Sequence, residues 1–234
     1  MLVLNFHRVE SFTGFEITRL SPARFRMLMD ILADSRLRVA PLGAEPLASS
    51  SDVLITFDDG FASIAEHALP LVHERGWGAI VFLVADAVGT HDDWDVRLLG
   101  RRRPMMSWEE ARRWSEVGIE FGSHSLTHAD LTALSERQMA QGAGYDAAFA
   151  TDASIEDGVD RYAIPRVNVH NLMSTFQYRS LLRAASPAQG RRDRWFGQGR
   201  SRLYTSLSAG SAVVGNWRRQ SHEVGGAHPT RVEV

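Results

Sequence analysis

The sequence contains no cysteine and no lysine. The lack of cysteine excludes disulfides, thiolate nucleophiles and thiolate metal sites, and it removes redox usage as a guide to compartment. The lack of lysine excludes Schiff-base and lysine general-base chemistry. No apolar run reaches the length of a transmembrane helix, and residues 1–8 carry charge too early for a signal peptide. We therefore expect no membrane span and a cytoplasmic location.

The net charge is also small, because 26 basic and 28 acidic residues leave a formal net charge of only -2. Such a balance provides no general attraction to nucleic acid or to an anionic membrane. The chain of 234 residues with 44% hydrophobic content is long enough for one sizeable α/β core. We expect no nucleic-acid partner.

Apolar runs alternate with helix signals along the first half of the chain. Strands are predicted at residues 2–6, 53–57, 79–84 and 119–122, and helices are predicted from 22, over 61–75 and from 108. Shorter extended pieces are predicted at 145–151 and 164–169. This alternation predicts a parallel sheet with right-handed crossovers, either open or closed into a barrel.

Two adjacent carboxylates, Asp58 and Asp59, follow the apolar run 53–57 and precede Gly60. The glycine indicates the turn that leaves the strand. Two neighbouring carboxylates at the end of a core strand repel each other, so they require a cation or a strong hydrogen-bond donor. In α/β proteins this end of the strand is where active sites form.

Two imidazoles, His124 and His128, follow a later predicted strand with a spacing that suits a divalent metal. The carboxyl ends of parallel strands lie at the same edge of the sheet, so one carboxylate and the two imidazoles can form a three-ligand site. Only one aspartate is needed as a ligand. The other can act as general base towards water, whose pKa a bound metal lowers.

These two motifs resemble those of a known family. T-F-D-D-G at 56–60 and H-S-L-T-H at 124–128 are similar to the first and second motifs of the polysaccharide deacetylases of the NodB-homology type, carbohydrate esterase family 4. F-H-R-V at 6–9 and D-W-D at 93–95 also resemble members of this family. The resemblance extends from about residue 2 to residue 183.

The resemblance implies a role for each motif residue. Asp58 would be the catalytic base, and Asp59, His124 and His128 would bind a divalent metal, most often zinc, with cobalt or a similar ion as an alternative. The substrate would be a carbohydrate, an N-acetylated glycan. The implied reaction is metal-dependent hydrolysis of N-acetyl groups on the amino sugars of a polysaccharide or glycan.

The resemblance also implies a distorted (β/α) barrel of the NodB-homology type, and here the sequence departs from the family. The third family motif, an Arg or aromatic residue with Pro-Tyr-Gly, has no counterpart near residues 141 and 142. Roughly 30 residues, the size of one strand-helix unit, are missing at this point. We expect a barrel that lacks one unit.

Three further residues are weaker candidates. His170 lies near the place of the family's late general-acid histidine. Arg166 could replace a missing active-site arginine, and Trp94 could stack on a sugar ring, although a loop aromatic is more often a packing anchor. His7 is interpreted as an ordinary residue at a strand end.

The domain prediction has two parts. Residues 1–185 are predicted to form the polysaccharide deacetylase-like domain, and 186–234 to form a tail rich in Gly, Ser and Arg that is poorly ordered.

Because of the missing unit, two alternatives to the deacetylase remain. One is a truncated, non-catalytic member that binds metal or glycan, and the other is a deacylase of a smaller substrate.

Overall fold

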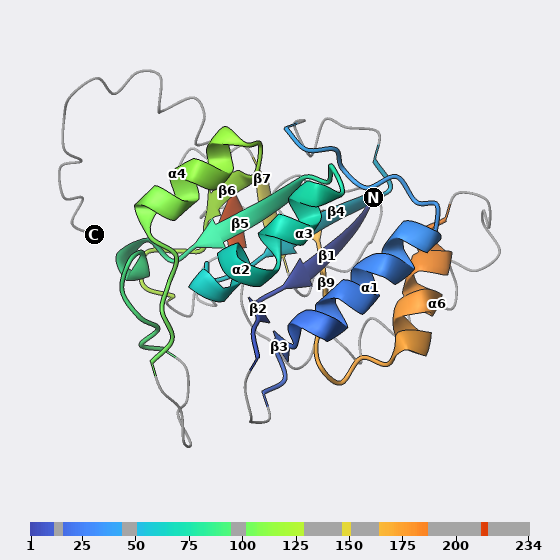
Figure 1. Cartoon of the computed structure of the whole chain (residues 1–234), viewed down its shortest axis with the longest axis horizontal. Coiled ribbons are helices and arrows are strands. Elements are labelled where there is room, and N and C mark those ends of the chain that lie inside the picture. The colour runs from blue at the N-terminus through green and yellow to red at the C-terminus, as the bar shows by residue number, and fades with distance from the viewer. Residues whose placement is uncertain are drawn as a thin grey trace.

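The structure is a computed structural model of the whole chain (Figure 1). It describes residues 1–11, 16–43, 51–94, 102–128, 147–150 and 164–186, together with the backbone of 212–214. Most of the predicted tail lies outside the described residues. The division at residue 185 therefore stays a prediction.

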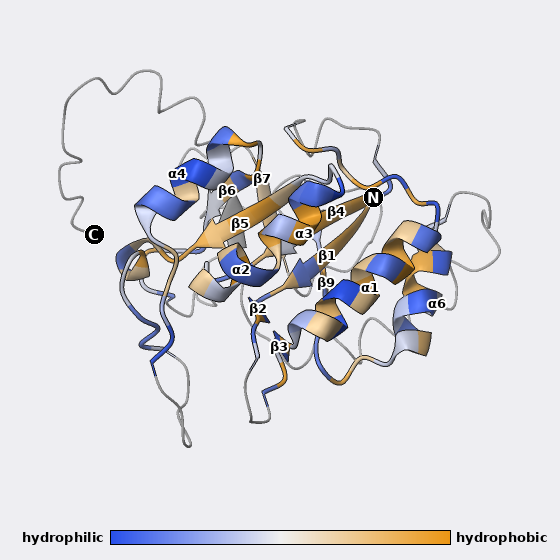
Figure 2. Cartoon of the chain, in the orientation of Figure 1, coloured by the Kyte–Doolittle hydropathy of each residue, from blue (hydrophilic) through white to orange (hydrophobic). Residues whose placement is uncertain are grey.

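Four parallel strands form the centre of the fold. They are β1 (Leu2–Phe6), β4 (Val53–Phe57), β5 (Ala79–Leu83) and β6 (Glu120–Ser123), in the order β6-β5-β4-β1. Figure 2 shows that β1, β4 and β5 are mainly hydrophobic, as expected of strands that are covered on both faces. All four strands lie within one or two residues of their predicted bounds.

The remaining strands bend the sheet round on itself. The full order is β8-β7-β10-β6-β5-β4-β1-β9, with β8 (Ile164–Pro165) and β9 (Val167–Asn168) at opposite ends. Only Arg166 separates these two strands in the chain, so the first and last strands of the sheet must meet at this residue. The arrangement is consistent with the distorted barrel that the resemblance implies.

A strand from far along the chain lies at the place of the missing unit. β10 (Ala212–Val214) lies between β6 and β7 (Ala147–Ala150) and pairs with both in the antiparallel sense. Its central residue, Val213, is opposite Ser123 of β6 and Ala148 of β7. The sequence did not predict a strand here, because it lies within the region interpreted as a tail.

Two hydrophobic clusters reflect the alternation of side chains along the strands. The smaller cluster contains Leu54, Ile80, Phe82 and Phe149, which occupy one face of their strands. The larger cluster contains the alternate residues of the same strands and the helices that cover them. Three polar residues alternate along their strands with residues of the larger cluster, namely Asn5, Thr56 and Asp58. They therefore lie on the same face of the sheet as the smaller cluster, next to the candidate site.

The helices agree with the sequence in part. α1 (Pro22–Asp34) begins after the N-cap Ser21, and α4 (Trp108–Glu116) begins at the predicted position with a capping box of Ser107 and Glu110. The prediction of one helix over 61–75 was wrong, since the segment forms α2 (Ala62–His67) and α3 (Leu69–Glu74). Pro70 explains the break, because it lacks the backbone N–H that a continuous helix requires.

The sequence analysis did not predict α6 (Thr175–Ala185), which packs against α1. Its signal is a capping box in which Ser174 and Gln177 bond to each other's backbone N–H groups. A short 3₁₀ helix, η1 (Ala85–Ala87), follows β5. Within the described part of the chain, no helix has both the length and the apolar character needed to cross a membrane.

Candidate metal centre and the Asp58 pocket

The turn after β4 points two consecutive carboxylates in different directions. The Asp58 N–H still donates to the Phe6 carbonyl at 2.9 Å, so the strand pairing continues to this residue. Asp59 then has a φ of 69° and Gly60 a φ of 76°. A Cβ on residue 60 would lie 2.4 Å from a side-chain carbon of Leu83, which explains the requirement for glycine.

The second motif turns sharply at the end of the neighbouring strand β6. The His124 N–H donates to the Leu83 carbonyl at 2.8 Å, and the carbonyls of Ser125 and Leu126 accept hydrogen bonds from Ala85 and Asp86 of η1. These bonds hold the motif against the residues that follow β5. Ser125 and His128 both have positive φ, at 65° and 58°.

Positive φ at a residue other than glycine is uncommon and costs free energy. The described residues contain four such positions, and three of them, Asp59, Ser125 and His128, belong to the two motifs. Strain of this kind concentrates at functional sites.

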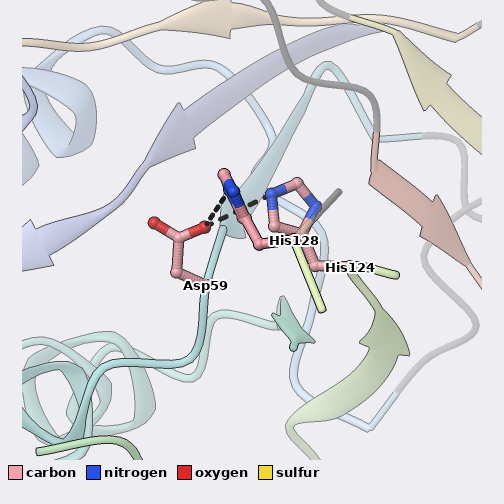
Figure 3. Close-up of side chains that lie close together, drawn as sticks. All are labelled: Asp59, His124 and His128. Carbon is pink, nitrogen blue, oxygen red and sulfur yellow. Dashed lines mark ion pairs between the residues drawn. The ribbon is translucent and has the colours of Figure 1, made fainter. Parts of the chain in front are cut away.

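The two motifs converge on one carboxylate oxygen. Asp59 Oδ1 lies 3.3 Å from His124 Nε2 and 3.3 Å from His128 Nε2 (Figure 3). One ligand atom from each of the three residues lies within 4.8 Å of the others. The structure thus brings together Asp59, His124 and His128 from two strand ends that are distant in the sequence.

This arrangement fits a divalent cation. Two ligands at about 2.1 Å from a tetrahedral ion are about 3.4 Å apart, close to the separations around Asp59 Oδ1. That oxygen is buried and makes no hydrogen bond of good geometry, although a buried carboxylate oxygen normally has a donor. One carboxylate and two imidazoles form a set suited to zinc, with room for further ligands.

The charges around Asp59 favour its ionised form. Burial alone raises the pKa of this carboxyl, but His124 and His128, followed by the charge of His7, outweigh it and lower the pKa well below its usual range. Conversely, burial lowers the pKa of His124, while Asp58 and Asp59 raise it, with a net increase. The carboxylate therefore remains charged and able to bind a cation.

Asp58 has a different set of partners. Arg166 Nη1 donates to its Oδ1 at 2.6 Å, and Asn5 Nδ2 donates to its Oδ2 at 2.8 Å. Both side chains of the ion pair are almost fully buried. Burial raises the pKa of Asp58, but Arg166, His124 and His7 reverse this effect and lower it. Asp58 is thus a buried, oriented carboxylate.

A buried polar network holds these partners in place. Asn5 Oδ1 accepts hydrogen bonds from Thr56 Oγ1 at 2.8 Å and from Arg166 at 3.2 Å. Asn5 Nδ2 also donates to Asn168 Oδ1 at 2.7 Å. The sequence analysis missed Asn5 and Thr56, although a polar residue inside each apolar strand was a signal that could have identified them.

His7 lies closer to Asp58 than the sequence suggested. Its Nε2 lies 3.8 Å from Asp58 Oδ2, and its side chain is 15% exposed. Burial lowers the pKa of His7 more than Asp58 and Asp59 raise it. The interpretation of His7 as an ordinary residue at a strand end omitted this contact.

His170 and Trp94 occupy different surroundings. His170 Nδ1 accepts a hydrogen bond from the Leu172 N–H, and its pKa is lowered by burial and then by Arg24. These contacts belong to the turn before α6, and the general-acid role stays a prediction. The Trp94 ring stacks on the His128 ring, with centroids 4.8 Å apart and planes at 12°.

Comparison with known structures places this fold among deacetylases. IcaB from Ammonifex degensii is 20% identical, with a TM-score of 0.59, over 79% of this chain and 96% of the other. A polysaccharide deacetylase from Bacillus cereus is 18% identical, with a TM-score of 0.59, over 77% of this chain and 68% of the other. At these identities the likeness establishes the fold.

Sequence comparison supplies the family. The family model for polysaccharide deacetylase matches residues 48–145. The Bacillus subtilis (strain 168) protein named "Putative polysaccharide deacetylase YxkH" is 27% identical over 90 residues, which span 38% of this chain and 28% of that relative. The resemblance that the two motifs predict is therefore confirmed, because the stretch of residues 48–145 that matches the family model includes Asp59, His124 and His128.

Proposed function

We propose that the protein is a metal-dependent hydrolase that removes N-acetyl groups from the amino sugars of a polysaccharide or glycan. The observation that carries this proposal is the approach of His124 and His128 to the same oxygen of Asp59, at 3.3 Å each. A second carboxylate, Asp58, lies next to this group and has its own partner, Arg166. The family match supports the same class of reaction.

The residues present allow a division of roles. Asp59, His124 and His128 would hold the divalent cation, and their donor atoms favour zinc. When bound, such a cation acts as a Lewis acid that polarises a carbonyl and makes water more acidic. Asp58 accepts the proton of the attacking water as general base.

The contacts of Asp58 suit this role. Arg166 and Asn5 orient its two oxygens, and the lowered pKa keeps the carboxylate ionised at neutral pH. A fixed, ionised base next to the substrate requires little reorganisation during the reaction. In the overall reaction, the water oxygen bonds to the acetyl carbon, the amide C–N bond breaks, and the products are acetate and the free amine.

The test combines metal content with acetate release from oligomers of N-acetylglucosamine. Asp58→Asn is expected to retain zinc and to lower turnover by roughly 10²- to 10⁴-fold, the usual contribution of a general base. Asp59→Asn is expected to lose zinc. Asp52→Asn is a matched control, because Asp52 pairs with the exposed Arg38, and both metal content and turnover should stay unchanged.

Three outcomes would contradict the proposal in different ways. Loss of zinc from Asp58→Asn would mean that the two aspartates have the opposite roles. Stoichiometric zinc without release of acetate from any amide or ester would support the alternative of a non-catalytic binding module. Release from small amides or esters but not from sugar oligomers would favour the deacylase of a smaller substrate.

A further inference from the structure

His128 is the least enclosed of the three residues that converge at the candidate metal centre. Its side chain is 31% exposed, whereas those of His124 and Asp59 are 6% and 8% exposed. Surrounding packing therefore restrains this imidazole less than the other. The His128 ring nevertheless directs its Nε2 at Asp59 Oδ1. A further contact that fixes the plane of this ring would account for its orientation.

We propose that Trp94 is a positioning residue for His128, a role that the family match does not assign. The two rings lie nearly parallel at 12°, with 4.8 Å between their centroids. His124 meets His128 edge-on, at 68° and 5.1 Å. The indole therefore covers a face of the imidazole, and rotation of His128 about its side-chain bonds would break this contact. The inference rests on the proposed metal centre.

Buried contacts hold the loop that carries Trp94. Asp92, two residues earlier, is fully buried, and its Oδ1 accepts the Arg103 backbone N–H at 2.6 Å. The Asp92 N–H donates to the Arg103 carbonyl at 3.0 Å. These bonds join the two sides of the loop immediately before Trp94.

The Arg103 side chain connects this loop to the segment that follows β1. Its guanidinium donates to Glu10 at 3.1 Å and also bonds to Glu16. The side chain of Arg103 is 12% exposed, so water screens these charges only in part. Arg103 therefore ties the Trp94 loop to the same part of the chain that supplies Asn5 and His7.

The stack should act before a metal binds. Aromatic pairs in this geometry stabilise their arrangement beyond the area that they bury. A ring already held in the binding orientation loses less conformational freedom when it accepts a cation. Loss of the stack should therefore weaken metal binding, by roughly 2- to 12-fold in Kd.

The experiment compares Trp94→Ala, Trp94→Leu and Trp94→Phe in the full chain. In the metal-free protein, the NMR signals of the His128 ring, identified by their loss in His128→Asn, should show the ring-current shift of the indole. Alanine and leucine should abolish that shift, and phenylalanine should retain part of it. Leucine keeps apolar volume without a ring, so it separates stacking from packing.

Zinc affinity, measured by calorimetry, gives the second result. Alanine and leucine should raise the Kd by roughly 2- to 12-fold, and phenylalanine by less than about 2-fold. Trp114→Ala is the matched control, because Trp114 contacts His73 edge-on at 6.2 Å, away from the three converging residues. Thermal unfolding of each variant identifies any general loss of folding.

Three results would overturn the inference. They are an unchanged His128 shift in Trp94→Ala, an unchanged zinc Kd, and a leucine variant that binds zinc as well as phenylalanine does. A changed KM for sugar oligomers with an unchanged zinc Kd would instead show that Trp94 binds substrate. If the unmodified protein binds no zinc, the proposed metal centre is wrong. The ring-current shift of the His128 signals in the metal-free protein still tests the stack on Trp94 in that case.

Discussion

The two halves of the candidate site come from differently built parts of the sheet. Asp58 and Asp59 follow β4, which pairs in parallel with β1 and β5 over five and three residue pairs. His124 and His128 follow β6, which pairs in parallel with β5 but meets the antiparallel β10 at one residue pair. The carboxylates thus rest on a continuous central sheet, whereas the imidazoles adjoin a short strand from far along the chain.

The difference lies in how far along the sequence each part of the sheet finds its strands. The part of the sheet that carries Asp58 and Asp59, here called the central half, is built from the first 125 residues and from the β8-Arg166-β9 segment that meets it. The part that carries His124 and His128, here called the imidazole half, also needs β10, which is separated from β6 by nearly 90 residues. Four substitutions test this contrast, from the largest expected effect to the smallest, and a cross-link then tests the placement of β10.

The largest effect is expected for Arg166→Met. Removing the guanidinium leaves Asp58 as a buried carboxylate without its charged partner, which typically costs about 3–5 kcal/mol. Urea denaturation measures the free energy of unfolding. The control, Arg38→Met, removes a pair whose arginine is 63% exposed, and about 1 kcal/mol or less is expected. Equal losses in the two variants would show that the central half does not depend on the buried pair.

A second prediction concerns the packing between the two halves. Phe149 of β7 is fully buried, and its ring lies 5.6 Å from that of Phe82 on β5. Phe149→Ala should lower the free energy of unfolding by about 3 kcal/mol. A double-mutant cycle with Phe82→Ala should give a coupling of about 0.5–1.5 kcal/mol. Additive losses would mean that β7 does not pack on the central sheet.

The turn of the first motif provides the third prediction. Gly60→Ala should cost roughly 2 kcal/mol, because alanine must adopt positive φ and also displace Leu83. Gly43→Ala is the control that isolates the backbone contribution. Gly43 has a φ of 72°, and a Cβ added there would meet no atom within 4 Å. A loss of about 1 kcal/mol in the free energy of unfolding is expected. Chemical denaturation of both variants gives the difference. A Gly60 loss no larger than that of Gly43 would exclude the Leu83 contact as a constraint.

The smallest effect is expected for Val213→Pro. Proline removes a backbone donor from β10, which pairs on both sides, and about 1–2 kcal/mol should be lost. Hydrogen exchange should also become faster at the amides of β6 and β7 than at those of β4. Unchanged exchange in β6 would mean that β10 does not support the imidazole half.

A cross-link tests the placement of β10 directly, because the natural chain has no cysteine. Ala148→Cys with Val213→Cys should form a disulfide, since these residues are register partners and facing residues of adjacent strands are close enough for this bond. Mass spectrometry detects it. Ala148→Cys with Ser35→Cys, at the C-cap of α1, measures chance contacts, and an equal yield would contradict the register.

Much of the fold could be predicted from local signals. The four central strands and the starts of α1 and α4 follow from apolar runs and capping residues. The break at Pro70 and the capping box of α6 were also visible in the sequence, but the interpretation did not use them. β10 could not be predicted, because three residues in a region rich in Gly, Ser and Arg have no periodicity and pair only with strands distant in the sequence.

The sequence by itself determined the motif residues Asp58, Asp59, His124 and His128 and the match of residues 48–145 to the polysaccharide deacetylase family model. Local patterns sufficed because each pair of residues lies directly after an apolar strand. Only the tertiary structure decided what these residues contact. Arg166 reaches Asp58 across 108 residues of sequence, and Trp94 contacts His128 although α4 and β6 lie between them in the chain. Such contacts depend on how the sheet curves and closes, which brings distant strand ends together and which no local pattern encodes.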